Sequence, residues 1–327
     1  MATPIGANEV TSIVNRFLFK NVTDQVYGSN PVTFRIFKNK KMMVTGGTQI
    51  EVPIMATKFS ALQWYEGYDL LDTSPSDVVK TMAFDWKQGQ VPVVIDEGTL
   101  IRTDSPDAIA NQISLKWDMA KIAMADGMGF AIFNDGLTDP KAITGLKGTV
   151  DDGTVLTTYG GLARAGNTQL NSVVNATNTL SLGLLQTVMG GVQKGGRHAT
   201  LICSRQEQYN RYWGLGAAGN NGQRFDVGPG GADEQLYSAG FTNLLFNGIP
   251  WVVDDHVFDG PSPSNSAILM LNEDYITLAV SPRADFYLEP FQKPVNQDAF
   301  VGKLKWFGQL ICTHPGRQAK LTNVSLP

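Results

Sequence analysis

Charged residues and cysteine are both scarce in this chain of 327 residues. Asp, Glu, Lys and Arg make up 17% of the sequence, whereas about a quarter is usual for a soluble protein. Either neutral polar side chains cover the surface, or much of it lies against other subunits. The only cysteines, Cys203 and Cys312, lie far apart and outside any Cys-x-x-Cys motif. This disfavours a disulfide framework and a zinc site, and we expect two buried thiols.

The sequence also lacks a basic block and a long apolar run. Its 26 basic and 30 acidic residues give a net charge of −4, which disfavours a protein that binds nucleic acid through phosphate neutralisation. No uninterrupted apolar stretch comes near the length of about 18 residues typical of a membrane span. The N-terminus has no basic segment followed by an apolar one. We therefore expect no membrane partner and synthesis in the cytoplasm.

Sequence motifs typical of enzymes are either missing or lie next to a secondary structure that does not suit them. Residues 214–219 match Gly-x-Gly-x-x-Gly, which is typical of dinucleotide binding, but the expected helix precedes the motif instead of following it. Asp254, Asp255 and His256 could supply a metal site or an acid–base pair, although on a strand only Asp254 and His256 share a face. Alternatively, they cap a turn at a strand end. We expect no catalytic residue, no metal and no cofactor.

The first forty residues predict an arm. Apolar residues recur there at a spacing of three and four, at Val10, Ile13, Val14, Phe17 and Leu18. Such a stripe is typical of an amphipathic helix that needs a partner surface. The breaker Gly28–Pro31 follows soon after, which favours an arm that leaves the body over an ordinary first helix. We expect Val10, Val14, Phe17 and Leu18 to contact another subunit.

An alternation of period two between residues 44 and 95 predicts two long strands. Between them, residues 64–69 are rich in aromatic side chains and residues 72–77 in turn formers, as at the far end of an extended hairpin. Because an isolated hairpin is only marginally stable in water, its apolar side chains need another surface. The side chains expected to contact a neighbouring subunit are Trp64, Tyr65, Tyr68, Met82, Phe84 and Trp86.

The rest of the chain predicts a long helix and then a mixed region. Helical spacing from Ile109 to Ile132 predicts a helix over 106–134, about 44 Å long at 1.5 Å per residue. Leu180–Val192 predicts a second helix, and 207–212 a third. The glycine-rich segment 214–235 predicts a loop. Strands are expected at 199–203, 249–253, 267–271, 286–288 and 304–311, so the fold class is α+β.

The order of these parts resembles the major capsid proteins of tailed bacteriophages, which have the Hong Kong 97-type fold. Residues 84–95 look like a strand of that family's extended loop, and residues 64–69 are similar to its tip. Residues 243–255 resemble the strand pair that closes the family's axial domain. Residues 271–275 and 308–312, with 317–319 following, look like its final strands. The resemblance covers nearly the whole chain.

The resemblance implies four regions and a structural role, not an enzyme. The regions are an N-terminal arm at 1–40, an extended loop at 41–98, a peripheral domain at 99–177 and 261–327 with a spine helix at 106–134, and an axial domain at 178–260. The implied function is self-assembly into hexamers and pentamers of an icosahedral head around double-stranded DNA, located in the virion after assembly in the host cytoplasm. A loop with Gly214, Gly219, Gly222, Gly228 and Gly230 would lie near the capsomer axis.

Besides copies of itself, the resemblance implies a portal protein, a separate scaffolding protein, a decoration protein in some cases, and packaged DNA bound without specificity. The scaffold is expected as a separate chain because only about 40 residues precede the hairpin. A net charge of −4 fits an inner wall that does not grip DNA. Two alternatives stay open. One is an encapsulin-like nanocompartment with an enzyme cargo, and the other is a soluble hydrolase or carbohydrate-binding protein that uses residues 254–256.

Overall fold

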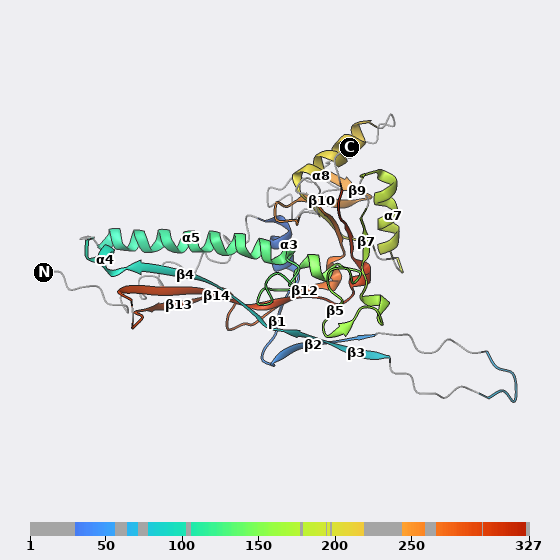
Figure 1. Cartoon of the computed structure of the whole chain (residues 1–327), viewed down its shortest axis with the longest axis horizontal. Helices are drawn as coiled ribbons and strands as arrows, with labels where there is room; N and C mark the ends of the chain where they lie inside the picture. Colours follow the sequence, from blue (N-terminus) through green and yellow to red (C-terminus); the bar gives the residue numbers. More distant parts are fainter. Residues whose placement is uncertain are drawn as a thin grey trace.

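The computed structural model describes residues 30–55, 64–70, 78–102, 106–176, 179–193, 195–196, 198–218, 244–258, 266–295 and 297–324. One of the two larger sheets runs alongside a long helix, the other lies beyond one end of that helix, and a hairpin projects from the body (Figure 1). The helices described are α3 (Pro31–Asn39), α4 (Glu97–Arg102), α5 (Pro106–Phe133), α6 (Leu146–Thr149), α7 (Leu182–Val192) and α8 (Gln206–Ala218).

The larger core lies between α5 and a five-stranded sheet. The strands of this sheet are β1 (Lys41–Met43), β4 (Lys87–Asp96), β12 (Ile276–Val280), β13 (Tyr287–Gln292) and β14 (Ala299–Cys312). The long strand β14 runs antiparallel to β4, β12 and β13. Burial alternates along its first half, so Leu304 and Trp306 lie in the core while Lys303 and Lys305 lie on the other face.

The helix α5 has 28 residues and confirms the predicted long helix to within one residue. Its side chains at Ile113, Trp117, Met124 and Met128 are buried against the sheet. The Trp117 ring meets the Phe291 ring of β13 edge to face, with 5.6 Å between centroids. Within the described part of the chain, no helix is both long enough and apolar enough to cross a membrane.

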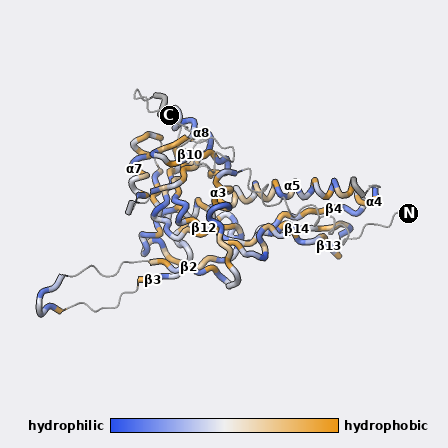
Figure 2. Tube along the Cα trace, turned by 180° about the vertical axis from the view of Figure 1, so that it is seen from behind, coloured by the Kyte–Doolittle hydropathy of each residue, from blue (hydrophilic) through white to orange (hydrophobic). Residues whose placement is uncertain are grey.

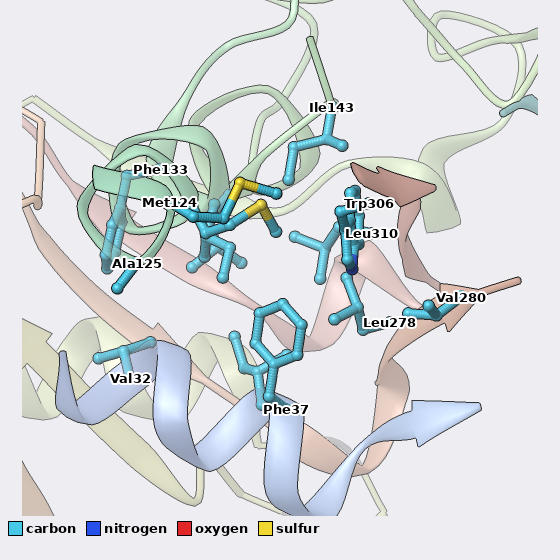
Figure 3. Close-up of a cluster of buried hydrophobic side chains, with 14 of the residues drawn as sticks. Val32, Phe37, Met124, Ala125, Phe133, Ile143, Leu278, Val280, Trp306 and Leu310 are labelled. Carbon is cyan, nitrogen blue, oxygen red and sulfur yellow. The ribbon is translucent and has the colours of Figure 1, made fainter. Parts of the chain in front are cut away.

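The helix α3, which lies within the range 1–40 expected to form the arm, packs in this core. Val32, Ile36 and Phe37 of α3 are buried, and Figure 3 shows side chains of α3, α5, β12 and β14 gathered in one cluster. Pro31 opens the helix, where the sequence predicts a break. Residues 31–39 therefore belong to the body, because α3 has an apolar face of its own that the break at Gly28–Pro31 obscured.

A six-stranded sheet forms the second core with α7 and α8. Its order is β7 (Val173–Asn175), β15 (Ala319–Leu321), β11 (Ile268–Leu271), β8 (Leu201–Ser204), β10 (Ile249–Val253) and β9 (Leu244–Phe246). Every residue of β8 and β11 is buried, as expected for strands covered on both faces. The strands predicted at 199–203, 249–253 and 267–271 are confirmed. So is the helix at 182–192, whose cap Ser181 Oγ accepts from the Leu184 N–H at 3.2 Å.

The segment expected to form the extended loop divides between the body and the hairpin. Strands β1 and β4 pair with β12 and β14 in the five-stranded sheet. Only β2 (Gln49–Met55) and β3 (Val79–Asp85), which pair antiparallel, leave the body as a hairpin (Figures 1 and 2). The range 41–98 expected for the extended loop was therefore too wide. The alternation of apolar residues continues from β3 into β4, and it does not show that β3 pairs with β2 whereas β4 pairs with β14.

Candidate assembly surfaces

The far end of the hairpin, residues 64–70, lies well away from the body (Figure 1). It forms a turn in which the Glu66 N–H donates to Asp69 Oδ2 at 3.0 Å, with Gly67 at a φ of 50°. Trp64, Tyr65 and Tyr68 are exposed, and Trp64 is 89% exposed. Large apolar side chains grouped in this way indicate contact with another molecule. Their predicted role between subunits stays a prediction.

Met82 and Phe84 face the body, so their predicted role as contacts with a neighbouring subunit is wrong. Both side chains are buried, and the Phe84 ring packs on Tyr159 with 5.2 Å between centroids. Tyr159 belongs to the ribbon of β5 (Thr158–Tyr159) and β6 (Leu162–Ala163), and the Ala83 N–H donates to Gly160 O in its turn at 3.0 Å. The alternation of apolar residues along the strand shows that Met82 and Phe84 share a face, but it does not show that the β5–β6 ribbon covers this face.

Trp86, also predicted as a contact with a neighbour, lies at the root of the hairpin. Its ring stacks on Phe307 of β14 with 4.9 Å between centroids, and its Nε1–H donates to Gly47 O at 3.1 Å. The side chain is half-buried within the subunit. Its visible role is therefore to fix the hairpin to the five-stranded sheet.

Most of the other predicted site residues lie outside the described residues. They are the arm contacts Val10, Val14, Phe17 and Leu18, and the glycines of the predicted axis loop Gly219, Gly222, Gly228 and Gly230. Gly214 is described, and the loop predicted there is wrong, because α8 continues to Ala218. Tyr212 stacks on Trp251 with 4.3 Å between centroids, and Leu215 packs on the same core. These contacts outweigh the cost of about 1 kcal/mol for a glycine in a helix. The Gly-x-Gly-x-x-Gly motif thus begins within a helix, unlike a dinucleotide-binding loop.

Asp254 and His256 do converge, and Asp126 of α5 joins them. His256 Nε2 lies 2.8 Å from Asp126 Oδ1, and His256 Nδ1 lies 3.2 Å from Asp254 Oδ1. Asp254 Oδ1 also accepts from the His256 backbone N–H at 3.0 Å, which is the predicted turn cap. The hydrogen bond to Asp254 raises the pKa of His256; burial opposes this, and Asp126 adds to it. The Phe130 ring meets the imidazole edge to face at 4.4 Å.

This cluster ties α5 to the end of β10 and offers little for chemistry on a substrate. Both ring nitrogens of His256 lie within hydrogen-bond distance of a carboxylate of the same subunit, so both already have partners within the fold. Among the described residues, no group of His, Cys, Asp and Glu side chains could hold a metal ion. Sequence reasoning missed Asp126, which is 130 positions from His256 and carries no local signal of the pairing.

A second apolar surface, which was not predicted from the sequence, lies on the outward side of α5. Leu115, Met119, Ile122 and Phe130 are each exposed by more than half. Their spacing places them on one face, opposite the buried Trp117, and we call these four residues the α5 stripe. Figure 2 shows hydrophobic residues recurring along the whole helix. The spacing of these four residues is visible in the sequence, but the helix prediction rests only on the other face, which runs from Ile109 to Ile132.

Comparisons with known proteins support the fold. No protein-family model and no curated protein matches the sequence. The structure is similar to the capsid of cyanophage A-1(L), with a TM-score of 0.63 and 13% identity over 95% of this chain and 96% of that one. It is also similar to the holo-SrpI encapsulin of Synechococcus elongatus, with a TM-score of 0.59 and 11% identity over 99% and 92% of the two chains.

A third similar structure is the capsid of a native GTA particle, with a TM-score of 0.57 and 12% identity over 89% of this chain and 90% of that one. The matches extend over nearly the whole length of both chains, whereas the identities are low. The likeness therefore lies in the fold. The Hong Kong 97-like α+β architecture expected from the sequence is confirmed.

Proposed function

We propose that this chain is the major structural subunit of an icosahedral bacteriophage head, which assembles as hexamers and pentamers around double-stranded DNA. The observation that carries the proposal is the hairpin tip, where Trp64, Tyr65 and Tyr68 are exposed far from the body. Such side chains become useful only when another molecule covers them. The fold shared with the cyanophage capsid supports a second copy of the chain as that molecule.

The regional division belongs to the proposal, with changes that the strand pairing requires. We propose α5 as the spine of the peripheral domain, and α7, β8, α8, β9 and β10 as parts of the axial domain of 178–260. The six-stranded sheet also takes β7, β11 and β15 from the segments 99–177 and 261–327. The arm of 1–40 is reduced by α3, which lies in the core.

The proposed partners follow from this role. They are copies of the same chain, a portal protein, a separate scaffolding protein, a decoration protein in some assemblies, and DNA held without sequence preference. The virion is the proposed location, after assembly in the host cytoplasm. A net charge of −4 per subunit, repeated over a shell, supports a wall that does not bind DNA tightly. The proposal assigns no catalytic step to the chain.

An encapsulin-like nanocompartment is the second candidate. The similarity to the SrpI encapsulin over 99% of this chain favours it, because a compartment shell and a phage head can be built from the same fold. The two candidates differ in what the particle encloses, namely an enzyme or DNA.

The test is assembly of the purified chain, expressed alone and with a neighbouring scaffold-like gene. We expect closed shells or six-membered rings by sedimentation velocity and negative-stain microscopy. A folded monomer under both conditions would contradict either shell function. Shells that co-purify with one enzyme and no DNA would favour the nanocompartment. An Asp254→Ala variant that lost a measurable hydrolase activity would instead support the soluble enzyme.

A further inference from the structure

The junction between α5 and the end of β10 contains a histidine held between two carboxylates. His256 Nε2 lies 2.8 Å from Asp126 Oδ1 of α5, and His256 Nδ1 lies 3.2 Å from Asp254 Oδ1. A neutral imidazole has one N–H and one lone pair, whereas the protonated ring has two N–H groups. Because an ionised carboxylate can only accept hydrogen bonds, the arrangement matches the protonated ring at both nitrogens. The neutral ring can donate to only one of the two carboxylates.

The two carboxylates differ in how freely they can move. The Asp254 side chain is fully buried, and its Oδ2 has no hydrogen-bond partner among the described residues. The Asp126 side chain is 62% exposed and can turn into water. Because a buried carboxylate without a donor or a countercharge is costly, the single N–H of a neutral ring stays with Asp254. The contact with Asp126 is therefore the one that opens.

No further charge in the described part of the chain competes with these two. Asp254 first, and then Asp126, raise the pKa of His256 against the opposing effect of burial. The neighbouring acid Asp255 is exposed and is not among the charges that shift this pKa. On the side of β8, Cys203 stays a neutral thiol, because burial and the nearby Asp254 raise its pKa. Uncharged residues occupy the α5 positions one turn away from Asp126: Ile122, Ala123, Gly129 and Phe130.

The imidazole ring itself is held in place by close packing. The Phe130 ring meets it edge to face, with 4.4 Å between centroids. A Cβ atom added at Gly129 would lie 3.1 Å from two ring carbons of His256 and 2.4 Å from Asn30 Nδ2. Asn30 Nδ2 also donates to a backbone carbonyl of α5 at 3.4 Å, so the start of α3 meets α5 here as well. A change in the Asp126 contact thus acts at a point where three elements meet.

We propose that the contact between Asp126 and His256 is a pH-sensitive latch between α5 and the six-stranded sheet. While the ring is protonated, it donates to both carboxylates and the latch is closed. When Nε2 gives its proton to water, Nδ1–H keeps Asp254, the lone pair of Nε2 faces Asp126, and the Asp126 side chain turns into solvent. The inference does not depend on the proposed function, because it concerns a contact within one subunit.

The protonation of the two ring nitrogens tests the latch directly. Nitrogen-15 spectra are recorded on the full chain from about pH 5.5 to about pH 9, in solution for free subunits and under magic-angle spinning for assembled particles. The chain has three histidines, so His256→Gln identifies the signals of His256. We expect two protonated nitrogens at the lower pH and the Nδ1–H form at the higher pH. A ring that becomes the Nε2–H form, or one that does not titrate over this range, would overturn the proposal.

A second experiment measures the latch from the side of α5. Asp126→Asn supplies an amide that accepts from the protonated ring and donates to the neutral ring, so it keeps the contact at either pH. Hydrogen-exchange protection of the amides from 126 to 133, corrected for the intrinsic exchange rate, is compared at about pH 6 and about pH 9. We expect protection to fall about threefold or more in the unmodified chain and to stay constant in Asp126→Asn.

The matched control is Asp255→Asn, which removes a neighbouring exposed carboxylate and leaves the cluster intact. It should keep the pH dependence of the unmodified chain. Protection that falls equally in Asp126→Asn and in the unmodified chain would overturn the proposal, and so would constant protection in the unmodified chain. Neither result bears on shell assembly, which sedimentation velocity measures separately.

Discussion

At the scale of single residues, the body contains a buried ion pair between the six-stranded sheet and the segment after α6. Lys320 and Asp151 are almost completely buried, and Lys320 Nζ lies 2.7 Å from Asp151 Oδ1. Asp151 Oδ2 also accepts from the backbone N–H groups of Val155 and Leu156 at 2.8 Å and 3.0 Å. Burial alone would raise the pKa of Asp151, but these donors hold it well below its ordinary value. The pair therefore fixes β15 to the segment after α6.

We expect Lys320→Met to destabilise the subunit by about 3–5 kcal/mol, because the buried Asp151 carboxylate would lose the ammonium group that contacts it. Urea unfolding followed by circular dichroism measures the change. The double variant Lys320→Met, Asp151→Asn removes both charges and should lose less stability than the single variant. Equal losses in the two variants would show that packing, and not the unpaired carboxylate, accounts for the effect.

His256 also contributes to the stability of the folded subunit, and this contribution depends on pH. Its pKa is raised from the ordinary value of about 6.5 by Asp254 and Asp126. A raised pKa in the folded state stabilises the protein fully below about pH 6.5, and this contribution is lost as the pH rises through the raised value. We expect His256→Gln to cost at most about 1 kcal/mol at pH 5.5 and less at pH 9, since Asp126 is solvent-exposed.

Urea midpoints at the two pH values measure this difference. The control is Asp126→Asn, which keeps the imidazole and its bond to Asp254 and should reduce the pH dependence only in part. A difference between wild type and His256→Gln that is constant over this pH range would contradict the assignment.

At the scale of elements, the local spacing of apolar residues predicted which segments form helices and strands. The apolar spacing from Ile109 to Ile132 identified α5, because one face of the helix packs on one sheet. The predicted loop from Gly214 was wrong, because Tyr212 and Leu215 pack on a core assembled from strands distant in sequence. Asp126 and His256 pair across 130 positions, which no local pattern can reveal. Element types were thus predictable, whereas partners that come from tertiary pairing were not.

The contact between the hairpin and the β5–β6 ribbon gives a prediction at this scale. A Cβ atom at Gly160 would lie 2.7 Å from the Met82 Cβ, whereas at Gly161 it would meet nothing within 4 Å. Both glycines have positive φ, 55° and 77°, so alanine is strained at either position. We expect Gly160→Ala to destabilise by about 1–3 kcal/mol more than Gly161→Ala.

Hydrogen exchange at the Ala83 amide, which donates to Gly160 O at 3.0 Å, reports this contact directly. We expect faster exchange in Gly160→Ala than in Gly161→Ala. Equal exchange in the two variants would mean that the hairpin root accommodates the added methyl group.

At the scale of the whole molecule, the subunit combines a well-packed body with apolar surfaces that its described part does not cover. The body has two cores, and both the hairpin tip and the α5 stripe lie outside them. The root of the hairpin is anchored by Met82, Phe84 and Trp86, so the tip is held out from a fixed base. This arrangement separates folding from assembly, since side chains at the root stabilise the subunit while those at the tip are available to a neighbour.

That separation predicts different effects for substitutions at the tip and at the root. Trp64 and Tyr68 make little contact within the subunit, so Trp64→Ser and Tyr68→Ser should each change its unfolding free energy by less than about 0.5 kcal/mol. Burial of each ring on a neighbour is worth about 1.5–3 kcal/mol, so each change should raise the concentration needed for assembly by about tenfold or more. Sedimentation velocity measures that concentration.

The conservative Trp64→Phe should retain most of the contact, and Phe84→Ser at the root should instead lower stability by several kcal/mol. If Trp64→Ser assembled like the unmodified chain, the tip would not be a contact between subunits, whatever the fold has in common with capsid proteins.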